Sequence, residues 1–166
     1  LIEKLCGAVS RPSVAETATI IFSSGSTGEP KGVMLTHYNV AANAEAVGQA
    51  ITVNDSDKLL GILPLFHSFG YMSLWYAIRF GMGIVFHPNP LDAGKIGEVI
   101  ENEAVTFLIA TPTFLQIYMR RCSPGQLGSL RIVFTGAEKL TEKLAFAFEE
   151  KFGIKPIEGY GATECA

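Results

Sequence analysis

The chain has 166 residues, of which 48% are hydrophobic and 17% charged, a composition that favours a folded globular domain over a disordered segment. Its formal net charge is -3 and it contains no basic run, so nucleic-acid binding is not expected. The cysteines Cys6, Cys122 and Cys165 lie far apart and form no CxxC pair, which argues against a disulfide framework or a zinc site. A reducing compartment, the cytoplasm, is therefore favoured.

Apolar runs of strand length alternate with segments of helical periodicity along the chain. Thr36 is a suitable N-cap, Pro112 a first-turn residue and Gly153 a C-terminal stop for three of the helices. The predicted strands span 18–24, 32–35, 57–65, 83–87, 105–110, 129–136 and 154–161. The predicted helices span 37–50, 69–81, 92–104, 111–121 and 140–153.

Continuous, β-branched strands separated by helices predict parallel pairing with right-handed crossovers. The expected fold class is α/β, a layered and largely parallel sheet with helices on both faces. Ligands of such sheets bind beyond the carboxyl ends of the strands. Three clusters of glycine and polar residues follow predicted strands, at 23–32, 135–138 and 159–164, and they are the candidate site.

The uncharged run over 59–78 is nominally long enough to cross a bilayer as a helix. Gly61, Pro64 and Gly70 interrupt it, so a buried strand, a turn and a helix are expected instead of a transmembrane segment. The chain starts at Leu1 without a basic and apolar leader and stops at Ala166 without a turn signal. We expect both ends to be cut from a longer protein.

The stretch "IFSSGSTGEPKGVML" (21–35) places glycines, hydroxyl side chains and one lysine between two apolar runs. It is not a Walker A loop, because Pro30 and Gly32 stand where GxxxxGK[ST] requires Gly and then Ser or Thr. It is not a GxSxG nucleophile elbow either, because neither Ser24 nor Ser26 has glycines at both flanking positions.

The chemistry that remains in this loop suits a polyphosphate. Its glycines can turn backbone N–H groups inward, its hydroxyl groups are donors, and Lys31 adds a mobile positive charge. A flexible surface hairpin is the alternative for the same composition. Phosphate binding is favoured because the two flanking strands are expected to be buried.

Three ordered motifs carry a resemblance to a known family. "SSGSTGEPKG" (23–32) resembles the phosphate-loop signature of the adenylate-forming (ANL, AMP-binding) superfamily, which includes acyl-CoA and acyl-carrier-protein synthetases, luciferases and nonribosomal peptide adenylation domains. "LPLFHSFG" (63–70) and "EGYGATE" (158–164) resemble two later motifs of that family. The details are most similar to bacterial acyl-carrier-protein synthetase/2-acylglycerophosphoethanolamine acyltransferases and to long-chain acyl-CoA ligases.

The resemblance implies that residues 1–166 form a partial AMP-binding domain, a fragment of the large N-terminal domain of an adenylate-forming enzyme. It implies ATP-dependent activation of a fatty acid to an acyl-adenylate with release of pyrophosphate, then thioester formation on acyl carrier protein or CoA. We expect the ribose-binding aspartate, the hinge and the C-terminal lysine-bearing domain of the family to lie outside these 166 residues. We therefore expect the isolated chain to bind ATP weakly and to turn over negligibly.

The resemblance also implies roles for single residues, with ATP and Mg²⁺ as cofactors. Lys31, His67, Thr163 and Glu164 are implied to act in the reaction, and Glu164 to bind the magnesium ion. These residue types suit an anionic reaction centre and a hard cation. The residues implied to bind the nucleotide are Ser23, Ser24, Gly25, Ser26, Thr27, Gly28, Lys31, Gly136, Ala137, Glu138, Tyr160, Gly161 and Thr163.

Several of these residues have a plain structural alternative. His67 is either near the substrate carboxylate or a core histidine whose ring nitrogens bind the backbone. The turn 135–140 is either an adenine-side wall or an ordinary strand-to-helix turn. Taken alone, Tyr160 reads as a packing residue and Glu164 as a solvated carboxylate; the motif match favours the functional role for both.

Two other functional classes remain open from the sequence. One is a non-catalytic ATP- or AMP-binding module. The other is an acyl-transfer hydrolase that uses a loop serine with His67, which the failed elbow pattern disfavours. Membrane attachment, at the inner membrane, and a fused acyltransferase are implied for the whole protein only.

Overall fold

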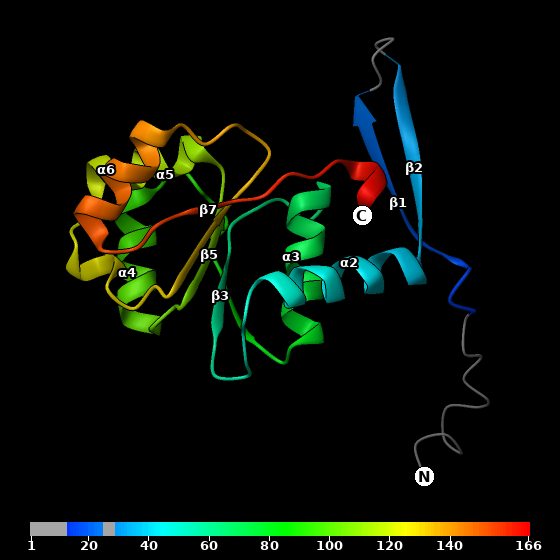
Figure 1. Ribbon diagram of the computed structural model, residues 1–166, viewed down its shortest axis with the longest axis horizontal. Helices are drawn as coiled ribbons and strands as arrows, with labels where there is room; N and C mark the ends of the chain where they lie inside the picture. The colour runs from blue at the N-terminus through cyan, green and yellow to red at the C-terminus, as the bar shows by residue number, and fades with distance from the viewer. Residues whose placement is uncertain (1–12, 25–28) are drawn as a thin grey trace.

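The computed structural model describes residues 13–24 and 29–166. It separates a five-stranded sheet with its helices from a two-stranded hairpin, and helix α2 (His37–Ala50) runs between the two parts (Figure 1). The sheet has the order β4-β3-β5-β6-β7 and all of its neighbouring strands are parallel. The α/β class and the parallel sheet predicted from the sequence are confirmed.

The sheet strands are short and alternate with helices along the chain. In chain order after α2 they are β3 (Lys58–Gly61), α3 (Ser68–Arg79), β4 (Gly83–Phe86), α4 (Ala93–Glu103), β5 (Phe107–Ala110), α5 (Pro112–Arg121), β6 (Ile132–Thr135), α6 (Glu142–Phe152) and β7 (Ile157–Glu158). Two 3-10 turns complete the chain, η1 (Gly125–Leu127) and η2 (Thr163–Cys165).

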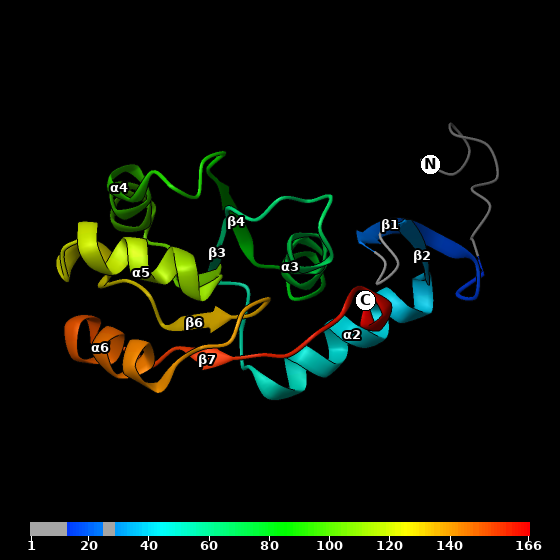
Figure 2. The same ribbon diagram turned by 90° about the horizontal axis from the view of Figure 1, so that it is seen from above.

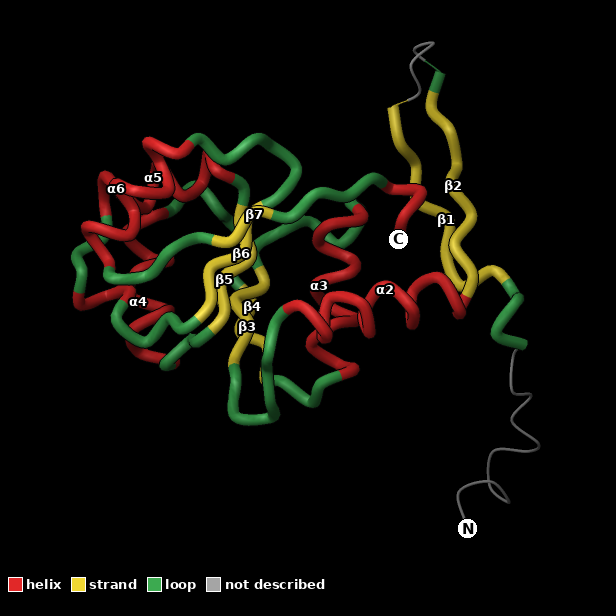
Figure 3. Tube along the Cα trace, viewed as in Figure 1, coloured by secondary structure: helices red, strands yellow, loops and turns green. Residues whose placement is uncertain are grey.

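Side chains of alternating direction give the sheet two buried faces. On β5, Leu108 and Ala110 belong to the core shared with α4, α5 and α6, whereas Phe107 and Ile109 belong to the core shared with α3. Figure 3 shows the strands between these two groups of helices, and Figure 2 shows the same layers from above. The prediction of helices on both faces is confirmed.

The predicted helix ends agree with the structure. Thr36 caps α2 in a capping box with Asn39, Pro112 opens α5, and Gly153 ends α6 in the left-handed conformation at φ 73°. Within the described ranges no helix is long and apolar enough to span a membrane. The uncharged run 59–78 is divided between β3 and α3, as expected.

The pair of strands around the glycine loop was predicted wrongly as part of the buried parallel sheet. β1 (Thr17–Ser24) and β2 (Pro30–Thr36) form an antiparallel hairpin of their own, on which Phe22 and Met34 are exposed. A parallel pair needs a crossover of about a dozen residues or more, which the segment 25–29 cannot supply. Among the residues that the structure describes, α2 and α3 cover one face of the hairpin.

All five strands of the sheet are shorter than predicted, β3 and β7 most of all. β3 ends at Gly61 instead of 65, and only Ile157–Glu158 of the predicted strand 154–161 pairs in the sheet. Pro64 has no N–H for a ladder, and His67 beyond it already caps α3. Residues 62–65 after β3 and 159–161 after β7 form loops at the carboxyl edge of the sheet, where a ligand would bind, whereas 154–156 precede β7 at the amino edge.

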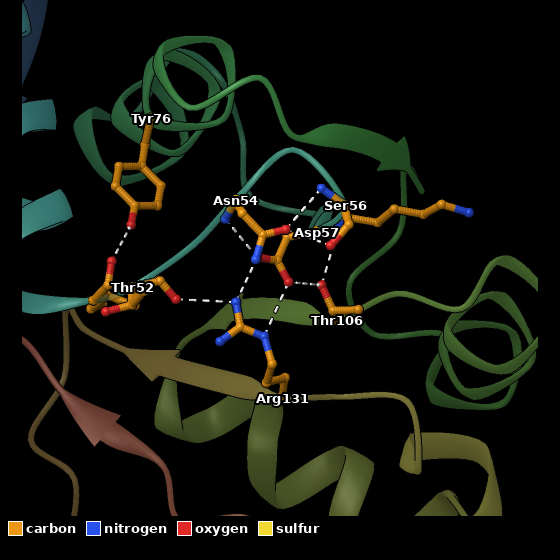
Figure 4. A network of polar contacts seen from close by, with 9 residues as sticks. Thr52, Asn54, Ser56, Asp57, Tyr76, Thr106 and Arg131 are labelled. Carbon is orange, nitrogen blue, oxygen red and sulfur yellow. Dashed lines mark hydrogen bonds and ion pairs between the residues drawn. The ribbon is translucent and has the colours of Figure 1, made fainter.

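The opposite, amino edge of the sheet is fixed by a polar network around the buried side chain of Asp57 (Figure 4). Asp57, Thr106 and Arg131 each stand immediately before a strand, β3, β5 and β6 respectively. The Arg131 guanidinium donates to both carboxylate oxygens of Asp57 at 3.2 and 2.5 Å, and the Thr106 hydroxyl donates to Asp57 at 2.7 Å. The network thus sets the position of three neighbouring strands.

Candidate functional site

A cavity of about 350 Å³ lies at the carboxyl edge of the sheet. Its walls come from α2, α3, strands β5 and β6, and the two segments that follow β6 and β7. Residues more than ninety positions apart in the sequence therefore share one cavity, among them His67 and Thr163.

The inner part of the cavity is apolar, and its residues come from α2, α3 and the strands. Tyr76 contributes a hydroxyl group, but this hydroxyl donates to the backbone oxygen of Ile51 at 3.0 Å. Burial, followed by the negative charge of Asp57, raises the pKa of Tyr76 to about 12, so the phenol stays neutral. The apolar lining residues are Val47, Ile51, Met72, Tyr76, Phe107, Ile109 and Phe134.

His67 lies at the rim of this cavity as the N-cap of α3. Its Nδ1 accepts a hydrogen bond from the Phe69 backbone N–H at 3.3 Å. In the neutral ring this places the proton on Nε2, which leaves a donor for a ligand. His67 is exposed, so the core-histidine alternative is wrong, although one ring nitrogen does bind the backbone.

The turn after β6 forms a second wall. Gly136 is buried and Ala137 exposed, and both line the cavity. Ala137 has φ 66°, a left-handed conformation that costs a residue with a Cβ about 1–2 kcal/mol. Strained backbone of this kind clusters at ligand sites, which is consistent with a wall of the cavity, although Ala104 adopts the same conformation as the C-cap of α4.

The segment after β7 forms the third wall. Tyr160, Gly161 and Thr163 line the cavity, and Tyr160 is 98% exposed, so its ring is free to stack on a ligand. Gly159 passes close to β6, and a Cβ there would overlap the ring of Phe134. The glycine therefore lets this segment approach the apolar part of the cavity.

The turn η2 at the end of this segment is held by two helices. The hydroxyl of Thr163 lies 3.4 Å from that of Ser68 on α3, and the Asn43 side chain on α2 donates to the Cys165 backbone oxygen at 3.1 Å. Figure 1 shows η2 beside the hairpin, in contact with β2. Thr163 and Glu164 thus lie on a turn that adjoins both the cavity and strand β2.

Two predicted carboxylates do not line the cavity. Glu138 accepts hydrogen bonds from the Thr113 backbone N–H at 3.1 Å and the Thr113 hydroxyl at 2.6 Å, so it joins the turn after β6 to the start of α5. Glu164 is exposed on η2, next to Thr163. Of the described part of the chain, no group of three or more His, Cys, Asp or Glu residues is placed to hold a metal ion.

The described residues of the predicted phosphate loop lie on the hairpin and do not line the cavity. Ser23 and Lys31 are cross-strand partners on β1 and β2, and Lys31 is exposed. Ser24 is the last residue of β1. Gly25, Ser26, Thr27 and Gly28 lie outside the described residues.

These residues fit a nucleotide with its magnesium ion. An exposed aromatic ring, a strained glycine-alanine turn and the Thr163 hydroxyl surround one space, which suits a base and a phosphate. Mg²⁺ is usually held by one or two carboxylates together with substrate phosphates, so a single carboxylate such as Glu164 is sufficient.

The sequence did not single out the apolar cavity residues or the two residues that hold η2. Tyr76, Phe107 and Ile109 look like ordinary core positions, because nothing local distinguishes a side chain under a cavity from one under a helix. Ser68 stands inside the quoted motif "LPLFHSFG", next to His67, and that position was the one available signal.

Known proteins resemble this chain in sequence. Residues 6–166 match the family described as AMP-binding enzyme. The long-chain-fatty-acid–CoA ligase of Bacillus subtilis (strain 168) is 32% identical over 158 residues, which cover 91% of this chain and 28% of that protein. The 2-succinylbenzoate–CoA ligase of Bacillus mycoides (strain KBAB4) is 34% identical over 153 residues, which cover 92% of this chain and 31% of that protein.

Solved structures agree with these matches. ATP-bound MatB from Rhodopseudomonas palustris superposes with a TM-score of 0.86 at 26% identity, over 96% of this chain and 32% of that one. O-succinylbenzoate coenzyme A synthetase (MenE) from Bacillus subtilis, in complex with ATP and a magnesium ion, gives 0.82 at 30% identity, over 93% and 32%. The chain thus spans about a third of these proteins. With a family match over nearly its whole length, the chain belongs to the AMP-binding enzymes.

Proposed function

We propose that this chain is a partial AMP-binding domain of an acid-thiol ligase that activates a fatty acid with ATP. The carboxylate attacks the α-phosphorus of ATP, pyrophosphate leaves, and a thiol of CoA or acyl carrier protein then takes the acyl group while AMP leaves. The observation that carries this proposal is the single cavity in which an apolar interior meets a rim made by His67, Tyr160 and Thr163. We place this chemistry in the cytoplasm.

Each rim residue has one task in this proposal. Tyr160 stacks on the adenine, Gly136 and Ala137 form the wall beside it, and Thr163 donates to the α-phosphate. The Nε2 proton of His67 faces the acid and orients its carboxylate. These contacts offset the repulsion between an anionic nucleophile and an anionic phosphate, which is the main barrier to the first step.

The triphosphate then extends past η2 towards the hairpin. Glu164 binds Mg²⁺ together with phosphate oxygens, and Ser23, Thr27 and Lys31 bind the β- and γ-phosphates. The contact between η2 and β2 supports this direction, because β2 begins with the last residues of the predicted phosphate motif. On this proposal the hairpin serves the same nucleotide although its described residues do not line the cavity.

A fatty acid is the proposed substrate because the lining of the interior is mainly aliphatic and aromatic. In the whole protein, pyrophosphate exchange with palmitate and octanoate should exceed exchange with acetate. A protein that prefers acetate would contradict the fatty-acid assignment but leave the ligase class intact. A protein that binds Mg-ATP in calorimetry yet exchanges pyrophosphate with no carboxylate would instead be a non-catalytic nucleotide-binding module.

Substitution of Val47 tests whether the apolar interior holds the acyl chain. Val47 is half-buried on α2 and lines the cavity, so V47F should fill part of it and lower exchange with palmitate about tenfold, since small changes of fit in a hydrophobic pocket are worth about 1–3 kcal/mol. A46F is the matched control, because Ala46 is exposed on the same helix. An equal loss with palmitate and acetate would mean that the substitution disturbs the fold and not the acyl site.

A further inference from the structure

We infer that Ser68 is a positioning residue that sets the direction of the Thr163 hydroxyl proton. The Ser68 side chain is on α3 and the Thr163 side chain is on η2, with 3.4 Å between their oxygens. The two residues stand 95 positions apart and both line the cavity. The inference rests on the proposed function, in which Thr163 donates to the α-phosphate.

The number of protons decides which hydroxyl donates in this pair. Each hydroxyl carries one proton and two lone pairs. If Thr163 gives its only proton to the phosphate, its oxygen must accept in the contact with Ser68. Ser68 is then the donor, and the order is Ser68 to Thr163 to phosphate. The same contact with the direction reversed would leave Thr163 with no proton for the ligand.

The Ser68 hydroxyl is available for this task because it has no capping role. Ser68 is the first residue of α3, and the side chain of His67 already caps the helix by accepting from Phe69. Ser68 is only 9% exposed, so its hydroxyl is largely shielded from competing water. By contrast, Ser73 on the same helix donates its hydroxyl proton to the Gly70 backbone oxygen at 2.7 Å.

The distance between the Ser68 and Thr163 oxygens and the way η2 is held both suit a hydrogen bond that shortens when the ligand binds. Hydroxyl pairs typically lie about 2.7 Å apart, and hydrogen bonds in ligand-free sites are often longer than in the complex. Asn43 on α2 also holds η2, through the Cys165 backbone oxygen. A small movement of η2 towards α3 would therefore shorten the contact without releasing the turn.

A double-mutant cycle in the whole protein tests this inference. The variants are S68A, T163A and S68A/T163A, and calorimetry gives the Kd of a non-reactive fatty acyl-adenylate analogue. We expect S68A to weaken binding about tenfold, the upper range for one hydrogen bond, and to add nothing in the T163A background. S68T restores the hydroxyl and should recover most of the binding.

Pyrophosphate exchange supplies the kinetic readout. S68A should lower kcat about tenfold while the KM for the fatty acid changes less than about twofold, because the lost contact acts on the phosphate. S129A is the matched control, since Ser129 is another partly buried serine, with its hydroxyl bound to the backbone oxygens of Ile100 and Val105. S68A should fold normally, as alanine is the most favourable helix residue.

The outcomes separate this inference from the proposed function. If the unaltered protein is active and S68A binds the analogue as tightly, the inference is wrong. An S68A effect of the same size with and without the T163A change would show that Ser68 acts independently of Thr163 and would also overturn it. An unaltered protein that neither binds the analogue nor exchanges pyrophosphate would overturn the proposed function itself.

Discussion

D57A is expected to lower the free energy of unfolding of the five-stranded sheet by about 3 kcal/mol, because it removes the buried carboxylate that accepts hydrogen bonds from a guanidinium, a hydroxyl and a backbone N–H. The Asp57 side chain is 3% exposed and accepts hydrogen bonds from Arg131, Thr106 and the backbone N–H of Asn54. The Arg131 side chain is 46% exposed, so water compensates part of the hydrogen bonding that its guanidinium loses in D57A. This places the effect at the lower end of the range for a buried pair.

Amide hydrogen exchange of β3, β5 and β6 measures this loss within a larger protein, because it reports the stability of individual strands. D55A is the matched control: Asp55 is an exposed carboxylate two residues away, and its removal should change stability by no more than about 0.5 kcal/mol. D57N should fall between the two, since the amide keeps some hydrogen bonds but loses the charge. Equal protection in D57A and D55A would show that the network contributes little.

The same pair gives a pH dependence of known sign. Burial acts to raise the pKa of Asp57, but hydrogen bonds from Arg131, Thr106 and the Asn54 backbone, together with the Arg131 charge, hold this pKa below its ordinary value. A lowered pKa in the folded state stabilises the protein above the unfolded pKa of about 3.9, and this stabilisation is lost as the pH falls through the folded value. The difference between D57A and the unaltered protein should therefore shrink below about pH 4.

The sequence predicted the layered sheet because its signals are local. Strand-length apolar runs, helical periodicity and the caps Thr36 and Gly153 each depend on a few neighbouring residues. The hairpin was predicted wrongly although its signal was also present. The segment 25–29 between its strands is too short for a parallel crossover, and loop length should have outweighed the apolar pattern of the strands.

The Asp57 network and the cavity interior could not be predicted in this way. Asp57 lies 49 positions from Thr106 and 74 from Arg131, and only the parallel order of the strands brings them together. Nothing in the sequence around Phe107 and Ile109 distinguishes side chains that line a cavity from side chains that pack in a core. His67 and Thr163, by contrast, stand in motifs that can be recognised in the sequence, and the fold places both residues at the same cavity.

The described residues of the predicted phosphate motif lie on the hairpin and do not line the cavity. Substitution of Lys31 is therefore the sharpest test of phosphate binding by this motif. K31A in the whole protein is expected to lower kcat/KM for ATP about 100-fold, the loss typical of one preorganised group that stabilises developing charge. Lys31 is exposed on β2, across from Ser23, so its removal should leave the hairpin folded. K31R keeps the charge and should retain part of the activity.

K155A is the matched control for K31A. Lys155 is also exposed, but it lies just before β7, at the amino edge of the sheet and away from the cavity. Its removal takes away the same charge, so a loss seen only in K31A reflects the position of the lysine and not the net charge of the protein.

Calorimetry with Mg-ATP and with AMP adds a second criterion. K31A should weaken Mg-ATP and leave AMP unchanged, because AMP has no β- or γ-phosphate, whereas equal weakening of both would place Lys31 at the α-phosphate or the base.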